Sequence, residues 1–203
     1  MFDCCYITVF SFVTAQIVSA ELSENEEKEI GSLMKRVPSL VIMGQSNYAK
    51  AHVANEIMQR NILPTHDCKE RWRSAVFRYG TSDSLSLQLP DSYELVDERI
   101  MKGREWKTVP IEDLVLTDED IANDGALEKA VLEINLRHNL LKEGGILSVV
   151  QAFHSQHSRE HIQDVFTKFT SEVIPVVIYT VSSKLLSQQV SFVIWLKRNF
   201  YNY

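Results

Sequence analysis

Residues 39–51 read SLVIMGQSNYAKA, and this stretch does most to decide the fold. An apolar run is followed by Gly44, four further residues, a small residue and Lys50. The phosphate-binding pattern G-x-x-x-x-G-K-[ST] has this frame, and it needs a strand before the loop and a helix after it. Leu40 to Met43 is predicted to be a buried strand, and Lys50 to Arg60 the helix that follows.

Two residue types that phosphate chemistry requires are missing from this frame. The second glycine lets backbone N–H groups wrap the phosphates, and here it is replaced by Ala49. The Ser or Thr hydroxyl that holds Mg²⁺ is replaced by Ala51. Lys50 could still neutralise a phosphate, or it could be a solvated lysine at the start of a helix. The loop therefore predicts the strand, turn and helix of a nucleotide-binding fold, without all of the residues that bind the phosphates and Mg²⁺.

Length, charge and cysteine usage narrow the class of protein. The 203 residues suffice for one α/β domain with a sizeable core, and the net charge of −6 argues against nucleic acid as a partner. The three cysteines form neither a disulfide framework nor a C-x-x-C pair, which favours a reducing, cytoplasmic location. A short basic cluster around Trp72 (Lys69, Arg71 and Arg73) is interpreted as a solvated loop or helix face.

The N-terminal residues leave the location open. Residues 7–20 are apolar and end in V-S-A, which is typical of a signal-peptidase site. No Lys or Arg precedes Lys28, and Asp3 lies near the start, which argues against a secretory leader. The alternative is a buried helix or strand. Residues 21–35, which follow, are charged and are predicted to form a solvated helix.

Apolar runs further along the chain predict alternating strands and helices. Buried strands separated by helices favour a three-layer α/β fold with a largely parallel sheet. Strands at 74–79 and 84–89 are predicted to form a hairpin through residues 80–83, with the serine face of the second strand exposed to water. The other predictions are a helix at 93–100, an acidic surface loop at 110–124, a helix or strand at 127–136, strands at 146–150 and 174–181, and a helix at 158–169.

The C-terminal residues do not fit a simple continuation of this sheet. Residues 191–196 are apolar and would suit one more strand. Only residues 182–190 separate them from the strand at 174–181, and a parallel crossover needs about a dozen residues or more. Either the two segments pair antiparallel, or the tail is not the natural continuation of the domain. The fold is expected to be incomplete at its C-terminus.

Two patterns after the loop resemble the GTPase domain of dynamin-type proteins. That family follows its phosphate loop with a helix of the form L-N-x-L-x-G-x-x-x-L-P-T, and residues 53–65 read VANEIMQRNILPT. A strand ending R-Y-G comes next in the family, and residues 76–80 read VFRYG. A closer resemblance is to the dusty family of dual serine/threonine and tyrosine protein kinases, in the region upstream of their catalytic domain. It extends over residues 38–189 and includes YELV at 93–96 and WKTVPIEDL at 106–114.

This resemblance implies a regulatory region rather than a kinase. The Gly-rich loop, V-A-I-K, H-R-D and D-F-G motifs of kinases are all absent from the chain. The expected division is an N-terminal apolar segment and charged helix (1–37), a degenerate GTPase-like domain (38–189) and a divergent or truncated tail (190–203). The implied partners are signalling proteins, among them the full-length kinase. The implied location is cytoplasmic, with association at a membrane or cell junction left open.

The resemblance also places the D-T-P-G motif of dynamin-type proteins at the end of the strand at 146–150. Val149 then replaces the acid that binds Mg²⁺ through water, and Ala152 replaces the Gly whose N–H senses the γ-phosphate. Thr65 lies near the position of a Mg²⁺-coordinating switch threonine, although a turn residue after Pro64 is the preferred interpretation. Since phosphoryl transfer depends on positioning and charge neutralisation, these losses should remove most of the catalysis.

The sequence therefore predicts a non-catalytic, GTPase-like module with no catalytic residue, no metal site and no required cofactor. Gly44, Lys50 and Thr65 are the candidates for a vestigial nucleotide site. One alternative is a weak GTP- or ATP-binding hydrolase that uses Lys50, with Mg²⁺ not expected. A second alternative is a secreted interaction protein. A Zn²⁺ site at His154, His157 and His161 is a weaker interpretation than a solvated helix start.

Overall fold

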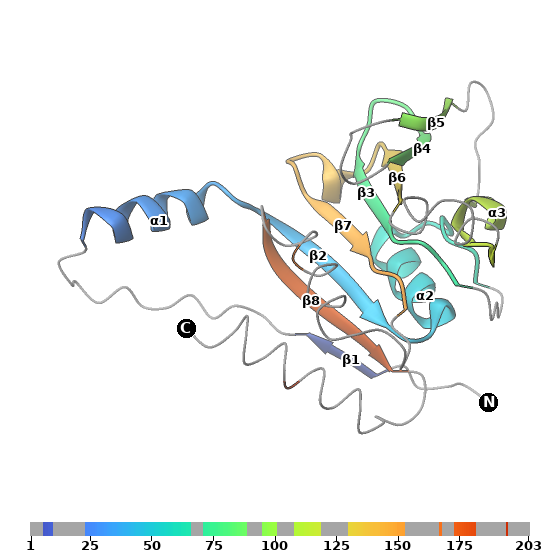
Figure 1. The fold of residues 1–203 in the computed structure, drawn as a ribbon, viewed down its shortest axis with the longest axis horizontal. Coiled ribbons are helices and arrows are strands. Elements are labelled where there is room, and N and C mark those ends of the chain that lie inside the picture. The colour runs from blue at the N-terminus through green and yellow to red at the C-terminus, as the bar shows by residue number, and fades with distance from the viewer. Residues whose placement is uncertain are drawn as a thin grey trace.

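A computed structural model describes residues 6–9, 23–65, 71–88, 95–100, 108–118, 130–152 and 173–181, together with Thr167 and Ile194. Within this part of the chain the strands form an eight-stranded sheet in the order β1-β8-β2-β7-β3-β6-β4-β5 (Figure 1). The strands are β1 (Tyr6–Val9), β2 (Val37–Gly44), β3 (Ala75–Tyr79), β4 (Ser84–Gln88), β5 (Leu95–Ile100), β6 (Val131–Leu136), β7 (Ile146–Val149) and β8 (Val173–Val181). The helices are α1 (Glu24–Met34), α2 (Asn47–Met58), α3 (Ile111–Leu114) and the short 3₁₀ helix η1 (Asn139–Leu141).

The centre of the sheet is built around β2. This strand pairs in parallel with β8 on one side and with β7 on the other, and β3 pairs in parallel with β6. Antiparallel pairings join β1 to β8, β3 to β7, β6 to β4 and β4 to β5. Val41, Ile42 and Met43 are fully buried, as expected for an apolar strand with neighbours on both edges. The prediction of an α/β sheet is confirmed.

Helix α2 covers one face of this central region and supplies much of the core (Figure 1). Its buried face carries small and apolar side chains that pack against β2 and β7. Ser46 caps the start of the helix, because its Oγ accepts a hydrogen bond from the backbone N–H of Ala49. Gln59, in the left-handed conformation with φ 49°, ends it. The core cluster includes Ala51, Val53, Ala54 and Met58 of α2 with Ile42, Phe77, Ile134, Leu147 and Val149 of the sheet.

Helix α1 lies where the charged run predicts a helix, and a capping box begins it. The carboxylate of Glu26 accepts hydrogen bonds from the backbone N–H and the hydroxyl of Ser23, at 2.8 and 2.7 Å. These bonds lower the pKa of Glu26, with the side-chain bond to Ser23 as the larger cause. Early glutamates also complement the helix dipole. Within the described residues, no helix is both long and apolar enough to cross a lipid bilayer.

The predicted hairpin between the strands at 74–79 and 84–89 is wrong. Strand β6 lies between β3 and β4 and pairs with both, so residues 80–83 pass over a strand instead of forming a tight turn. The backbone N–H of Gly80 donates to the carbonyl of Leu136, which ties this connection to the end of β6. Ser84 and Ser86 are buried, so the expected wet serine face is also wrong.

Strand pairing also determines the secondary structure of two segments whose hydrophobic periodicity is misleading or ambiguous. Residues 95–100 form β5 alongside β4, so the predicted helix at 93–100 is wrong where the structure describes it. Residues 131–136 form a strand, which settles the ambiguity at 127–136 for the part that the structure describes. The helix predicted at 158–169 and the strand predicted at 191–196 lie outside the described residues, except for Thr167 and Ile194, which are both helical.

Residues 110–118, which are the described part of the predicted acidic surface loop at 110–124, are anchored in the core, contrary to that prediction. Leu114 and Leu116 are buried, and Trp72 forms an antiparallel bridge with Val115. Backbone hydrogen bonds from Arg73 N–H to the Leu114 carbonyl and from Leu116 N–H to the carbonyl of residue 71 fix this bridge. Trp72 and Arg73 are therefore buried, so the solvated interpretation of the basic cluster is wrong for both.

Candidate functional site

The turn between β2 and α2 is shorter than a phosphate-binding loop. Strand β2 ends at Gly44 and α2 begins at Asn47, so only Gln45 and Ser46 separate them. The N–H of Ala49 donates to Ser46 Oγ at 3.2 Å, and the N–H of Lys50 donates to the Ser46 carbonyl at 3.1 Å. A phosphate-binding loop directs such backbone N–H groups at the ligand. Here the first turn of the helix already uses them.

Lys50 lies inside the protein rather than in solvent. Its side chain is 1% exposed, and Nζ donates a hydrogen bond to the carbonyl oxygen of Val150 at 2.7 Å. Desolvation by burial lowers the pKa of Lys50 from 10.5 to about 7. The interpretation of Lys50 as a solvated lysine at a helix start is therefore wrong. Its side chain joins the start of α2 to the residue that follows β7.

Gly44 is required by the neighbouring strand β8. Its φ of 146° is a conformation that side-chain-bearing residues rarely adopt. A Cβ atom placed on Gly44 would collide with Thr180 Oγ1 and would lie 2.6 Å from the Thr180 carbonyl oxygen. Thr180 Oγ1 in turn donates to the carbonyl of Met43 at 3.1 Å. This packing accounts for a glycine here whether or not a phosphate binds.

The two positions that the resemblance assigns to Mg²⁺ binding, Ala51 and Val149, carry apolar side chains. Ala51 is 0% exposed and Val149 is 4% exposed, and both belong to the main apolar cluster. Ala49, in place of the second glycine, is also buried. Neither alanine nor valine offers an oxygen ligand to a hard cation. Among the described residues, no group of three or more His, Cys, Asp or Glu side chains could hold a metal ion. His154, His157 and His161 lie outside the described residues.

The residues directly after β7 are hydrogen-bonded from several sides. The N–H of Val150 donates to the carbonyl of Ile42 at 2.9 Å, and the N–H of Gln151 donates to Ser74 Oγ at 3.0 Å. Lys50 bonds to the carbonyl between these two N–H groups. Sequence reasoning did not identify Ser74 as part of this site, since a lone serine before a strand carries no signal of its own.

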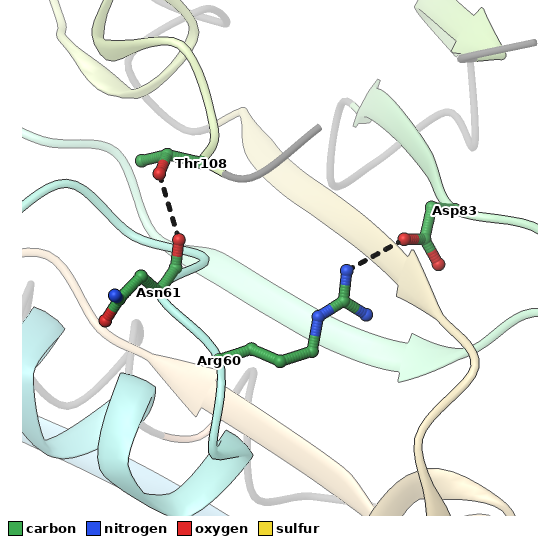
Figure 2. Close-up of polar contacts among 4 residues, drawn as sticks. All are labelled: Arg60, Asn61, Asp83 and Thr108. Atoms are coloured by element: carbon green, nitrogen blue, oxygen red, sulfur yellow. Dashed lines mark hydrogen bonds and ion pairs between the residues drawn. The ribbon is translucent and has the colours of Figure 1, made fainter. Parts of the chain in front are cut away.

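The loop after α2 is fastened by Asn55. Its Oδ1 accepts hydrogen bonds from the N–H groups of Ile62 and Leu63 at 3.0 and 2.8 Å, and its Nδ2 donates to the Leu63 carbonyl at 2.8 Å. Figure 2 shows two further polar interactions of this loop. They are the ion pair of Arg60 with Asp83 and the hydrogen bond from Thr108 Oγ1 to the Asn61 carbonyl.

Thr65 does not lie with Lys50 in a shared pocket. It is exposed and lines a surface pocket of about 500 Å³, of which Lys50 is no part. The other lining residues come from the same loop and from the segment before and within α3: Asn61, Leu63, Pro64, Thr108, Val109 and Ile111. Of the three predicted site residues, the structure thus places Gly44 at the end of β2, Lys50 in the first turn of α2 and Thr65 on the loop after α2.

Comparison with known proteins identifies the relatives of this chain. The dual serine/threonine and tyrosine protein kinase of Xenopus tropicalis is 34% identical over 179 residues, which cover 86% of this chain and 19% of the kinase. The kinase of the same name from Apis mellifera is 30% identical over 178 residues, covering 88% of this chain and 17% of the kinase. The chain is similar to one region of these kinases. It spans about a fifth of their length. No protein-family model matches it.

The fold has a counterpart among solved structures. A chain from a structure titled as an oligomerised bacterial dynamin pair matches with a TM-score of 0.52 at 14% sequence identity, over 89% of this chain and 34% of the bacterial one. At this identity the match concerns the fold alone. It confirms the predicted fold class, a dynamin-like α/β fold of the P-loop NTPase type. This chain therefore shares its fold with part of the bacterial dynamin-like protein.

Proposed function

We propose that this chain is a non-catalytic, GTPase-like module that acts through protein contacts in signalling. Its similarity to one region of the dual-specificity kinases, together with its dynamin-like fold, supports a regulatory role beside such a kinase. The observation that carries the proposal is the burial of Ala51 and Val149 in the apolar core, where a GTPase would present its metal-holding groups.

The chemistry of phosphoryl transfer explains why this observation matters. Catalysis of this reaction is almost entirely positioning and neutralisation of charge, and Mg²⁺ bridges the phosphate oxygens. A metal could not be held by Ala51 or Val149. Lys50, the remaining cationic group of the loop, is hydrogen-bonded to Val150 and would have to leave that carbonyl to reach a phosphate. The N–H groups of Ala49 and Lys50 would also have to leave Ser46.

Titration calorimetry with GTP and ATP, each with and without Mg²⁺, tests the proposal. We expect no saturable heat from either nucleotide and no effect of Mg²⁺. Tight, Mg²⁺-dependent binding that Lys50→Ala abolishes would favour the alternative of a weak nucleotide hydrolase. The matched control is Lys142→Ala, which removes an exposed lysine outside the β2–α2 turn. Loss of binding in both variants would indicate a general effect of charge instead.

A pull-down experiment with the immobilised chain tests whether it binds a dual-specificity kinase. The immobilised chain should retain purified full-length dual-specificity kinase under gentle conditions, and an unrelated α/β protein on the same support should not. Absence of any association would count against the proposed partnership. The proposed location is cytoplasmic, and membrane or junction association would follow from the partner. The alternative of a secreted interaction protein predicts a mature N-terminus at Glu21, which N-terminal sequencing of expressed protein would detect.

A further inference from the structure

One peptide unit at the end of β7 is hydrogen-bonded at both of its polar atoms. The unit joins Val150 to Gln151. Its carbonyl oxygen accepts from Lys50 Nζ at 2.7 Å, and its N–H donates to Ser74 Oγ at 3.0 Å. The N–H of Val150, one step earlier, donates to the Ile42 carbonyl at 2.9 Å. The three partners belong to α2, to the residue that precedes β3, and to β2, so three separate elements fix two consecutive residues.

We propose that Lys50 is a positioning residue that locks the Val150–Gln151 peptide unit in one orientation, so that the module presents the same surface with or without nucleotide. This inference rests on the proposed function, because it assigns to the loop lysine a task that needs no phosphate. In this role Lys50 binds the carbonyl of Val150 instead of a phosphate.

Burial is the first argument for this role. Lys50 is 1% exposed, and within the described part of the chain the Val150 carbonyl is the hydrogen-bond partner of Nζ. A buried amine without an acidic partner destabilises a folded protein unless its polar group is used. An apolar side chain of similar length would fill the same space without that penalty. The distinctive contribution of lysine at this position is therefore the bond that it donates to the backbone.

The second argument comes from how GTPases switch. Their switch segments become ordered through contacts with the γ-phosphate and its Mg²⁺ and are released on hydrolysis. Such a transition needs backbone N–H groups that are available to the phosphate. At Val150 and Gln151 both N–H groups are already bonded within the protein, and Ser74, which accepts one of them, is itself buried. These hydrogen bonds are the ones we expect of a segment that is ordered without a ligand.

Hydrogen exchange of the folded chain tests this role. In the wild-type chain, the amides of Val150 and Gln151 should exchange as slowly as those of the paired strands β2 and β7, and GTP with Mg²⁺ should not change them. Lys50→Met keeps a long side chain but removes the donor. Because one hydrogen bond is worth about 1 kcal/mol, exchange at Gln151 relative to the centre of β2 should rise roughly fivefold in this variant. Removal of the buried amine changes the global stability, which affects both sites alike, so the comparison with β2 isolates the local effect. Lys142→Met should alter neither amide.

The outcomes separate this inference from the function on which it rests. Fast exchange at Val150 and Gln151 in the wild-type chain, or exchange at Gln151 in Lys50→Met that is unchanged relative to the centre of β2, would overturn the locking role even if calorimetry detected no nucleotide. Nucleotide binding by the wild-type chain would overturn the proposed function, whatever the exchange of Lys50→Met. If Lys50→Met does not fold, Ser74→Ala removes the acceptor on the other side of the same peptide unit. It should raise exchange at Gln151 by a similar factor, and unchanged exchange there would contradict the inference.

Discussion

Asn55 and Leu63 are joined by two hydrogen bonds that use both ends of the asparagine amide. Oδ1 of Asn55 accepts from the Leu63 N–H, and Nδ2 donates to the Leu63 carbonyl, each at 2.8 Å. The side chain thus imitates a paired strand and folds the chain back against α2. It also accepts from the N–H of Ile62. Since Asn55, Ile62 and Leu63 are almost fully buried, water cannot replace these bonds.

Asn55→Ala should strongly destabilise the domain. The substitution removes the partner of the buried Leu63 N–H and of the Leu63 carbonyl, whereas the Ile62 N–H keeps its bond to the Arg60 carbonyl at 2.9 Å. Buried polar groups without partners cost about 1–3 kcal/mol each before relaxation. We expect the free energy of unfolding, measured by urea denaturation, to fall by about 3 kcal/mol. Asn61→Ala is the matched control, because among the described residues the hydrogen bond of this exposed asparagine is made by its backbone carbonyl. It should change stability by less than about 0.5 kcal/mol. Equal effects of the two variants would refute the role given to Asn55.

Gly44→Ala should destabilise the fold in the absence of any nucleotide. The new Cβ would meet both the hydroxyl and the backbone carbonyl of Thr180, and the φ of 146° is unfavourable for alanine. We expect a loss of more than about 2 kcal/mol, measured by thermal or urea unfolding without ligand. Thr180→Ala in the same chain should restore little of the lost stability, because the new Cβ would still collide with the carbonyl oxygen of residue 180.

Gly31→Ala is the control for this experiment. Gly31 lies within α1, and nothing lies within 4 Å of a Cβ placed there. Alanine is favoured over glycine inside a helix by about 1 kcal/mol, so this variant should be neutral or slightly stabilising. If both glycine variants were equally mild, the close approach of β8 to Gly44 would not be what requires a glycine.

The ion pair of Arg60 with Asp83 should contribute little to stability (Figure 2). The nitrogen and oxygen lie 3.1 Å apart, but the two side chains are 38% and 27% exposed, so water and salt screen the attraction. A double-mutant cycle of Arg60→Ala and Asp83→Ala should give a coupling free energy of about 0.5 kcal/mol that falls at high salt. A coupling several times larger, unchanged by salt, would mean that this pair organises the loop.

Much of the fold could be predicted because local pattern and burial agree. Leu40 to Met43 is apolar on both faces and lies at the centre of the sheet, and the charged run after residue 21 forms α1. The order of the strands could not be predicted, because insertion of β6 between β3 and β4 depends on contacts between residues more than forty positions apart. Hydrophobic periodicity does not report such pairings.

The candidate site shows the same limit at the level of single side chains. The absence of oxygen ligands at Ala51 and Val149 is visible in the sequence. The inward direction of the Lys50 side chain is not visible in the sequence, because a lysine in the first turn of a helix is usually solvated. Its burial follows from the early start of α2 at Asn47, which turns the Lys50 side chain toward the end of β7. The burial of Trp72 and Arg73 could not be predicted for a related reason, since the bridge of Trp72 with Val115 joins segments far apart in sequence.

The buried Lys50 should make the stability of the domain rise with pH. Its pKa is about 7 in the folded protein and near 10.5 in the unfolded chain, so the unfolded state binds the extra proton between these values. Stability increases with pH wherever the unfolded state binds more protons. We expect the free energy of unfolding to rise by about 2 kcal/mol between pH 7 and pH 9, and to change little from this group below pH 6. Urea denaturation at several pH values measures it.

Lys50→Met is the control that assigns this pH dependence. It removes the titrating amine, so the slope between pH 7 and pH 9 should largely disappear, while other groups titrate as before. The upper limit of pH 9 avoids Tyr179, whose pKa is raised by burial. That shift stabilises the fold below pH 10 and is lost as the pH rises through the folded-state pKa. The same slope in Lys50→Met and wild type would show that Lys50 is not the titrating group, and would place its amine in contact with water.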